Sequence, residues 1–241
     1  MLRDVLFLML TVTALPTSSF SQQLPNGGFE LWEKAGAESE EPVGWNGVMS
    51  GDLCLLCSVG ASQRVFQDSN EKVSGENSLR IESKAVLGGL VFNGTVTTGR
   101  VVAPSTTPSD GYSQTRQHDL GFNCPFTSRP DSLVFWAKYN ITDSSDSALV
   151  SFLLHGATNF QDPVKEEKKL AASCKYTFQT NGNWQRISMP FTYFSNTTNP
   201  EYLLATFGSS FLAGKGNGDA KLWIDDLELI YNRERLTMEV N

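Results

Sequence analysis

Hydrophobic and polar side chains alternate with a period of two along several stretches of this chain. In residues 79–83 the apolar and the charged side chains fall on opposite faces, which is typical of a half-buried strand. Residues 133–141 and 187–193 alternate in the same way. Pro190 lies within the last stretch and has no N–H for a strand ladder, so we expect an edge strand or a bulge there.

Three further stretches, residues 148–154, 202–207 and 222–231, are largely apolar on both faces and predict strands. Residues 164–172 are the one helix-like stretch, which we expect to form a solvated turn or one short helix. Turn residues separate the strands. The pattern predicts an all-β fold, an antiparallel two-sheet β-sandwich of jelly-roll type with about nine or more strands, in which the first and last mature strands are adjacent.

Composition agrees with this fold class and excludes several kinds of partner. The 241 residues include 20 Gly, 10 Pro and 15 Phe, and only 19% are charged, which excludes helical bundles and coiled coils. The chain has 26 acidic and 19 basic residues, for a net charge of -7. Nucleic-acid backbones and anionic membrane surfaces attract basic proteins, so we expect neither as a partner.

The N-terminal residues predict export from the cell. Residues 1–21 have a charged start, a short apolar run and a small-residue end, as a cleaved signal peptide does. The apolar run is too short to span a bilayer, which argues against the alternative of an anchor helix. We therefore expect residues 22–241 to form one domain with a polar tail after about residue 231, located in the periplasm, at the cell surface or outside the cell, without membrane insertion.

The cysteines and histidines do not suggest a metal or redox centre. They are Cys54, Cys57, Cys124, Cys174, His118 and His155. The Cys54 to Cys57 spacing resembles half of a zinc site or a redox pair, but the other cysteines are isolated and no strand-then-helix pattern presents the motif. One or two structural disulfides, or buried thiols, fit better, and the sequence does not separate the possible pairings.

Motifs at both ends of the mature chain carry a resemblance to known proteins. They are Asn26-Gly27-Gly28-Phe29-Glu30 with Trp32, Pro42-Val43-Gly44-Trp45, and the segment 222–231. These resemble the first and last strands of galactose-binding-like jelly rolls. With residues 94–99, 125–130 and 137–139, Trp184, and Ser209-Ser210, the series is similar to the bacterial family called the "putative carbohydrate metabolism domain". The resemblance covers about residues 26–231 and implies a carbohydrate-related function.

Three carboxylates at the chain ends are candidates for a structural calcium site. Sandwiches of the resembled type often tie the first strand to the last through calcium, and Glu30 with Asp225 or Asp226 matches those positions. Adjacent carboxylates also need a compensating cation or donors, and calcium prefers hard oxygen ligands. The alternative is that Asp225 and Asp226 straddle a bulge and accept hydrogen bonds from neighbouring N–H groups.

Aromatic side chains suggest where a sugar could stack, because a pyranose ring presents apolar C–H faces. Trp136 alternates with the apolar face of its predicted strand and is close to Lys138, whose ammonium could bind hydroxyls. These two residues are the candidate carbohydrate site. The other tryptophans, which we expect to pack in or beside the core, are Trp32, Trp45, Trp184 and Trp223.

Together these features predict an exported, monomeric carbohydrate-binding or glycan-utilisation accessory module whose partner is a glycan. A glycoside hydrolase is the first alternative, although no carboxylate pair or catalytic motif stands out in the sequence. An adhesion or structural sandwich without a small ligand is the second alternative. The sequence names no catalytic residue and no cofactor beyond the possible calcium ion.

Overall fold

A computed structural model describes residues 21–86, 89–194 and 198–232 of the chain. The predicted signal peptide lies outside these residues, apart from residue 21, and so does the C-terminal tail from residue 233. Both remain predictions. Within the described residues, no helix combines the length and apolar character needed to cross a bilayer.

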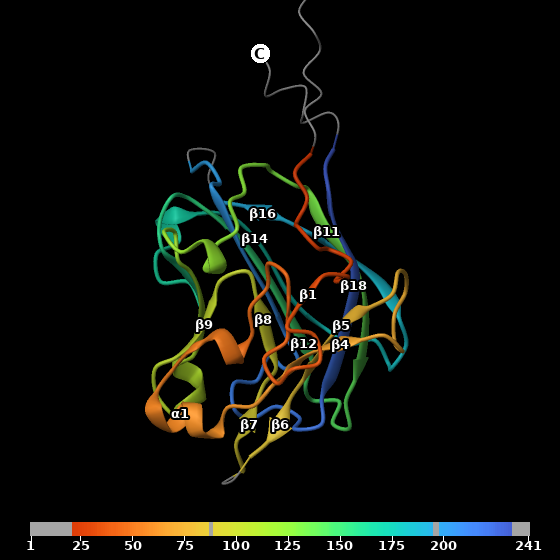
Figure 1. The fold of residues 1–241 in the computed structure, drawn as a ribbon. Coiled ribbons are helices and arrows are strands. Elements are labelled where there is room, and N and C mark those ends of the chain that lie inside the picture. Colours follow the sequence, from red (N-terminus) through yellow and green to blue (C-terminus); the bar gives the residue numbers. More distant parts are fainter. Residues whose placement is uncertain (1–20, 87–88, 195–197, 233–241) are drawn as a thin grey trace, which may run out of the picture.

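Two five-stranded antiparallel sheets face each other and form the sandwich (Figure 1). The first sheet has the order β15 (Gln185–Pro190), β11 (Ser132–Asn140), β18 (Lys221–Ile230), β5 (Ser78–Glu82) and β4 (Val65–Asp68). The second sheet has the order β16 (Thr192–Tyr193), β14 (Leu170–Phe178), β12 (Ala148–His155), β17 (Tyr202–Gly208) and β8 (Thr95–Thr97). The predicted all-β sandwich fold is therefore confirmed.

The core between these two sheets follows from the alternation in the sequence. Leu133, Phe135, Ala137 and Tyr139 of β11 are all buried on its inner face, because successive strand residues point to opposite sides. Phe207 of β17 lies at the centre. Its ring centroid is 5.3 Å from that of Phe135, 5.4 Å from that of Phe152 and 6.0 Å from that of Trp45. The expectation that Trp45 packs in the core is correct.

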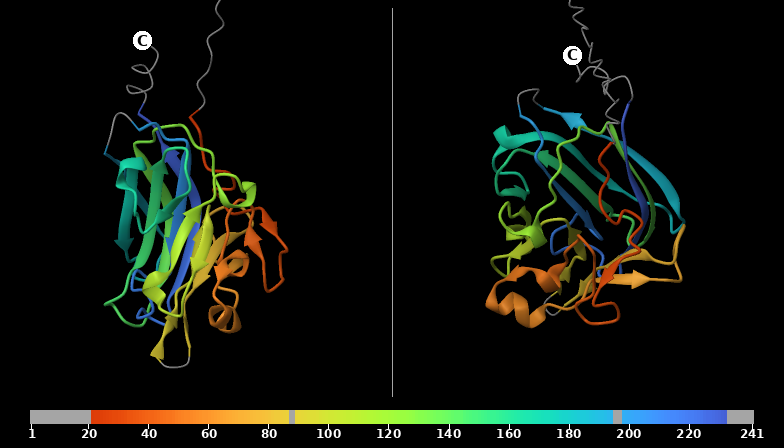
Figure 2. Two further views of the ribbon diagram at one scale, coloured as in Figure 1. Left: turned by 90° about the vertical axis from the view of Figure 1, so that its left-hand side faces the viewer. Right: turned by 45° about the horizontal axis from the view of Figure 1, so that its top comes forward.

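A third sheet covers part of the outer face of the second sheet, and the sequence did not predict it. Its order is β13 (Phe160–Asp162), β10 (Tyr112–Thr115), β9 (Arg100–Ala103) and β3 (Asp52–Leu53), with β3 parallel to β9. In the left view of Figure 2 the yellow-green strands β9 and β10 lie in front of the second sheet. The fold is thus a two-sheet sandwich with an added layer.

The remaining elements are short. Two small hairpins pair β1 (Trp32–Glu33) with β2 (Glu41–Pro42), and β6 (Lys84–Ala85) with β7 (Val91–Phe92). The α-helix α1 (Leu55–Gly60) was not predicted. The described single-turn 3-10 helices are η1 (Val48–Ser50), η3 (Pro108–Asp110), η4 (Leu120–Phe122) and η5 (Glu167–Lys169). Only η5 falls within the predicted helix-like stretch 164–172, which otherwise leads into β14.

Two details refine the predicted strands. Residues 187–193 do not form one strand, because the chain leaves the first sheet at Pro190 and enters the second sheet at Thr192. Both β15 and β16 are edge strands, as the proline predicted. The N-terminal segment around Gly27 lies beside β18, since the N–H of Leu227 donates to the Gly27 carbonyl at 2.9 Å. A Cβ atom at Gly27 would lie 2.5 Å from the Leu227 oxygen.

We predict that Phe207→Ala lowers the free energy of unfolding by about 3–5 kcal/mol, because it opens a cavity at the centre of the aromatic core. Phe194→Ala is the matched control, since Phe194 is 58% exposed, and should change stability by less than about 0.5 kcal/mol. Urea denaturation of both variants measures the difference. Equal effects of the two substitutions would contradict the assigned core.

Candidate functional site

A cleft of about 760 Å³ lies between the third sheet and one end of the second sheet. One wall carries residues of the third sheet, namely Leu53, Val101, Ala103, Ser113 and Asp162. The other wall carries residues of the second sheet and includes Leu149, Lys175, Thr177, Thr206 and Gly208. Loops 105–111 and 210–214 complete the rim, together with β7 and α1.

The third sheet packs against the second sheet beyond one end of the cleft. There Leu153, Phe160, Leu170 and Leu204 form a separate small hydrophobic cluster. At the Leu149 end of β12 the described residues form no such cluster between the layers, and the cleft opens there. Packing at one end therefore holds the two walls in fixed positions at the other.

His155 is part of the packed end. Its ring stacks on Phe160 at a centroid distance of 4.5 Å and on Tyr202 at 5.8 Å. Nδ1 lies 2.9 Å from the carbonyl oxygen of Gly156 and Nε2 lies 2.9 Å from the hydroxyl of Thr115. These contacts fit a neutral ring that donates from Nδ1 to the carbonyl and accepts the Thr115 proton at Nε2. Burial lowers the pKa of His155 to about 4, against a smaller opposite effect of the Gly156 carbonyl.

One side of the cleft carries a charged pair. Nζ of Lys175, on β14, lies 2.7 Å from Oδ1 of Asp162, on β13. Asp162 is buried, and Ser113 is its register partner on β10. Among the described residues that line the cleft, Asp162 is the only carboxylate.

Two buried oxygen atoms near the cleft have no hydrogen-bond partner among the described residues. Asn93 lines the cleft, and its side-chain amide donates to the carbonyls of Ser210 and Leu212, which leaves Oδ1 unpaired. Ser151 is fully buried, and its hydroxyl has no partner either. In register it stands between Lys175 and Thr206, which both line the cleft. Unpaired buried polar atoms are uncommon and often mark sites for water or ligand.

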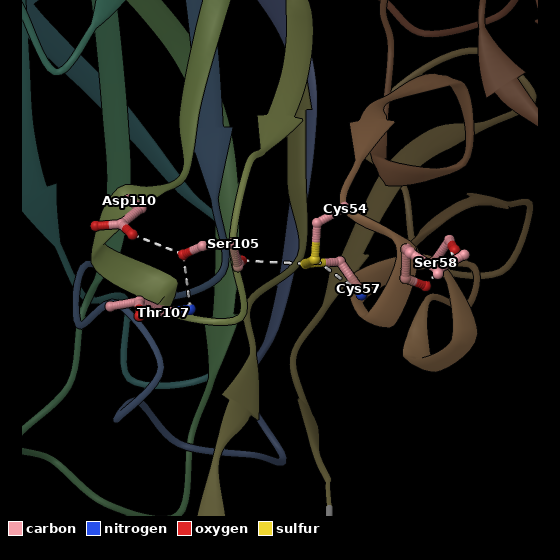
Figure 3. Close-up of a disulfide and its surroundings, with 7 residues drawn as sticks. Cys54, Cys57, Ser58, Ser105, Thr107 and Asp110 are labelled. Carbon is pink, nitrogen blue, oxygen red and sulfur yellow. Dashed lines mark hydrogen bonds between the residues drawn. A yellow bond between two sulfur atoms is a disulfide. The ribbon is translucent and has the colours of Figure 1, made fainter.

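A disulfide between Cys54 and Cys57 closes the first turn of α1 at the rim of the cleft (Figure 3). The Cys57 N–H donates to Sγ of Cys54 at 3.1 Å, which caps the helix. Sγ of Cys57 lies 3.1 Å from the carbonyl oxygen of Ser105, a packing contact because a disulfide sulfur carries no hydrogen. The Ser105 hydroxyl donates to Asp110 at 2.6 Å. The disulfide thus positions α1 against loop 105–111.

The other two cysteines, Cys124 and Cys174, are free thiols in the interior. Burial raises the pKa of both thiols to about 12, so neither is a reactive thiolate at neutral pH. The sequence predicted one or two structural disulfides or buried thiols. The structure has one disulfide, between Cys54 and Cys57, and two buried thiols.

The candidate carbohydrate residues Trp136 and Lys138 lie on the outer face of the first sheet, on the other side of the sandwich from the cleft. Trp136 is partly buried on β11, with Arg186 and Asp225 as its register neighbours. Nζ of Lys138 binds Oε1 of Glu71 at 2.9 Å and lies 5.3 Å from the centre of the Trp223 ring. The ammonium therefore already has a partner, and a role of Trp136 and Lys138 in binding stays a prediction.

The candidate calcium residues anchor the loop formed by residues 73–77. Glu30 accepts hydrogen bonds from the N–H groups of Glu76 and Asn77 at 3.1 Å. Gly75 has φ +61, and a Cβ atom there would lie 1.7 Å from Oε1 of Glu30. Only glycine therefore allows this loop to approach the carboxylate so closely.

Asp225 and Asp226 hold the other side of the same loop. Asp225 is fully buried and accepts the N–H groups of Val73 at 2.7 Å and Ser74 at 3.2 Å. Burial raises the pKa of Asp225 despite these hydrogen bonds. Asp226 has φ 48 at a break in the strand register and accepts the Ser74 hydroxyl at 2.7 Å. This arrangement matches the alternative to a calcium site, in which Asp225 and Asp226 straddle a bulge and accept hydrogen bonds from neighbouring groups.

Hydrogen-bond donors already surround these three carboxylates. N–H and O–H groups surround the carboxylates, whereas calcium needs six to eight oxygen ligands. Within the described residues, no three or more His, Cys, Asp or Glu side chains are placed to share a metal ion. Calcium at Glu30, Asp225 and Asp226 stays a prediction that only a metal titration can test.

Comparisons with known proteins give structural similarity alone. No family model and no curated protein matches the chain. A crystal structure from Bacteroides thetaiotaomicron, described as "a putative glycoside hydrolase", is 17% identical with a TM-score of 0.55, over 88% of this chain and 70% of that chain. A second structure with this description, from Bacteroides vulgatus, is 14% identical with a TM-score of 0.51, over 88% and 95%. Both likenesses support the sandwich fold.

We predict that the free energy of unfolding falls as the pH is lowered from about 6.5 to about 4 and that His155 causes up to about 3 kcal/mol of this loss. The unfolded state takes up a proton near pH 6.5, whereas the folded state does so only near the lowered pKa of about 4. Urea denaturation of the wild type and His155→Phe between pH 7 and pH 4 measures the difference. The exposed His118 gives the control His118→Phe. Parallel profiles for wild type and His155→Phe would refute this role.

For the loop 73–77, the bulge interpretation predicts the same melting temperature in excess chelator and in millimolar calcium, because N–H donors already satisfy the carboxylates. An ion that binds only the folded state would raise the melting temperature by mass action. Thermal scans with elemental analysis of the purified protein make this measurement. A calcium-dependent rise that Glu30→Gln removes would instead support the calcium site.

Proposed function

We propose that this protein is an exported module that binds glycans, or assists a glycan-utilising system, and that the glycan binds in the cleft. The observation that carries this proposal is the combination of groups in one cavity. Hydroxyl, amide and charged groups line it together with the aromatic residues Tyr112, Phe92 and Phe211. Sugar rings need both kinds of contact, since their C–H faces stack on aromatic rings while their hydroxyls require polar partners.

The polar groups of the cleft support this proposal further. Lys175 and Asp162 offer a donor and an acceptor, and the unpaired oxygens of Asn93 and Ser151 are nearby. Hydroxyl groups both donate and accept hydrogen bonds, so a sugar could bond to Lys175 and Asp162. A cavity of this kind favours a module that binds a ligand over an adhesion or structural module without a small ligand.

A glycoside hydrolase is the second candidate, and the descriptions of the two Bacteroides structures favour it. Hydrolysis of a glycosidic bond uses two carboxyl groups about 5 to 10 Å apart. Asp162 is the sole carboxylate among the described residues of the cleft lining, and it is paired with Lys175. Binding without hydrolysis is therefore the better-supported proposal.

Export and family membership belong to the same proposal. The predicted signal peptide and the Cys54–Cys57 disulfide both favour the periplasm, the cell surface or the extracellular space, where disulfides persist. The sandwich fold supports the resemblance to the bacterial carbohydrate family. If this chain belongs to that family, we expect it to share a role in glycan binding or glycan utilisation with the other members.

We predict that Phe211→Ala weakens binding of a glycan identified on an array by more than about 1 kcal/mol, because an aromatic contact is lost from the cleft. Phe211 is 44% exposed, so the folded state should tolerate the change. Phe194→Ala, outside the cleft, is the matched control and should bind like the wild type. Isothermal titration measures both affinities.

Trp136→Ala distinguishes the two candidate binding faces in the same titration. A glycan in the cleft predicts an unchanged affinity for Trp136→Ala. If Trp136→Ala loses affinity and Phe211→Ala binds normally, the glycan binds on the outer face of the first sheet. A mature protein that binds no glycan on the array would contradict the proposed function.

A further inference from the structure

The walls of the cleft change from polar to apolar across the third sheet. In register, Asp162 on β13 pairs with Ser113 on β10, and Ser113 pairs with Val101 on β9. Beyond β9, Leu53 on β3 pairs with Ala103. The polar groups therefore stand at the β13 side and the apolar side chains at the β3 side.

The apolar side continues beyond β3 into α1 and the β6–β7 hairpin. Leu56 of α1 and Leu90 beside β7 line the cleft and yet are 70% and 40% exposed. In Figure 1, α1 and the two strands of this hairpin lie at the same end of the molecule. Exposed leucines at the mouth of a cavity cost solvation unless a ligand covers them.

The opposite wall leaves space at this apolar side. Gly208 of β17 contributes no side chain, and its register partners are Thr95 and Leu149. The charged pair of Asp162 and Lys175 lies on the other side of the cleft. A sugar alone would satisfy the polar side and leave the apolar side facing water.

We propose that the cleft binds glycans that carry an apolar substituent, an alkyl, acyl or aryl group. The substituent lies between Leu53, Ala103 and Leu56, and the sugar hydroxyls meet Asp162, Lys175 and Ser113. This inference rests on the proposed glycan-binding function and specifies its ligand. The disulfide contributes indirectly, because it fixes α1 and with it the position of Leu56.

Matched alkyl glycosides test this proposal. Titration of the mature protein with methyl and n-octyl β-D-glucosides and β-D-galactosides, below their micelle concentrations, should show at least about ten-fold tighter binding of an octyl glycoside. Leu56→Ser should reduce that gain, the ratio of octyl to methyl glycoside affinity, at least about three-fold. Leu120→Ser is the matched control, because Leu120 is 90% exposed and lies outside the cleft.

A blocking variant checks the location independently. Ala103→Trp should fill the apolar side and remove the octyl gain, whereas Ala157→Trp, at an exposed position outside the cleft, should retain it. Circular dichroism confirms that each variant is folded. If Ala103→Trp does not fold, Leu56→Ser alone decides the location.

The outcomes separate this inference from the function on which it rests. Equal affinities for methyl and octyl glycosides, both lost in Phe211→Ala, would overturn the apolar substituent and keep glycan binding. Octanol that binds as tightly as the octyl glycosides would show that the sugar contributes nothing, which overturns glycan binding and this inference with it. An octyl gain that Leu56→Ser and Ala103→Trp both leave intact would place the alkyl group elsewhere and overturn the proposal.

Discussion

Strands β12 and β17 of the second sheet are buried on both faces, and the rest of the structure depends on that constraint. The inner face of this sheet packs Phe152 and Phe207 against the first sheet, as in any sandwich. Its outer face packs Leu153 and Leu204 under the third sheet. A sheet with two apolar faces must be covered twice, so the short strands β3, β9, β10 and β13 form a third layer. The cleft follows because this layer covers the outer face closely at one end only.

The two sides of the molecule use their polar residues differently. On the outer face of the first sheet, charged side chains bind one another and the loop 73–77, as Lys138 does with Glu71 and Asp225 does with Val73. Such contacts stabilise a surface and leave little free for a ligand. The lining of the cleft, by contrast, holds a single ion pair, and the unpaired oxygens of Asn93 and Ser151 lie in or beside its walls. That difference is the physical reason why we propose ligand binding in the cleft.

Rigid walls favour binding at such a site. If the walls were flexible, binding would have to order them, and the lost conformational entropy would weaken the affinity. One contact holds the third-sheet wall of the cleft, and another holds its rim. His155 and Phe160 hold the third sheet on the second sheet, and the Cys54–Cys57 disulfide holds α1 against Ser105. The carbohydrate chemistry proposed here therefore rests on a preformed cavity and requires no closing segment.

The sequence alone determined the sandwich, because burial on a strand face is recorded locally as a period of two. Residues 79–83 and 133–141 became β5 and β11 within a residue of their predicted bounds, and Pro190 marked the edges of both sheets. The third sheet, α1 and the cleft came only from the tertiary structure. Strands of two to four residues hold too few positions for a period to show, and pairing with distant strands is what makes them strands. The cleft likewise joins side chains such as Leu53, Asp162 and Lys175, whose proximity arises from packing of layers and leaves no local pattern in the chain.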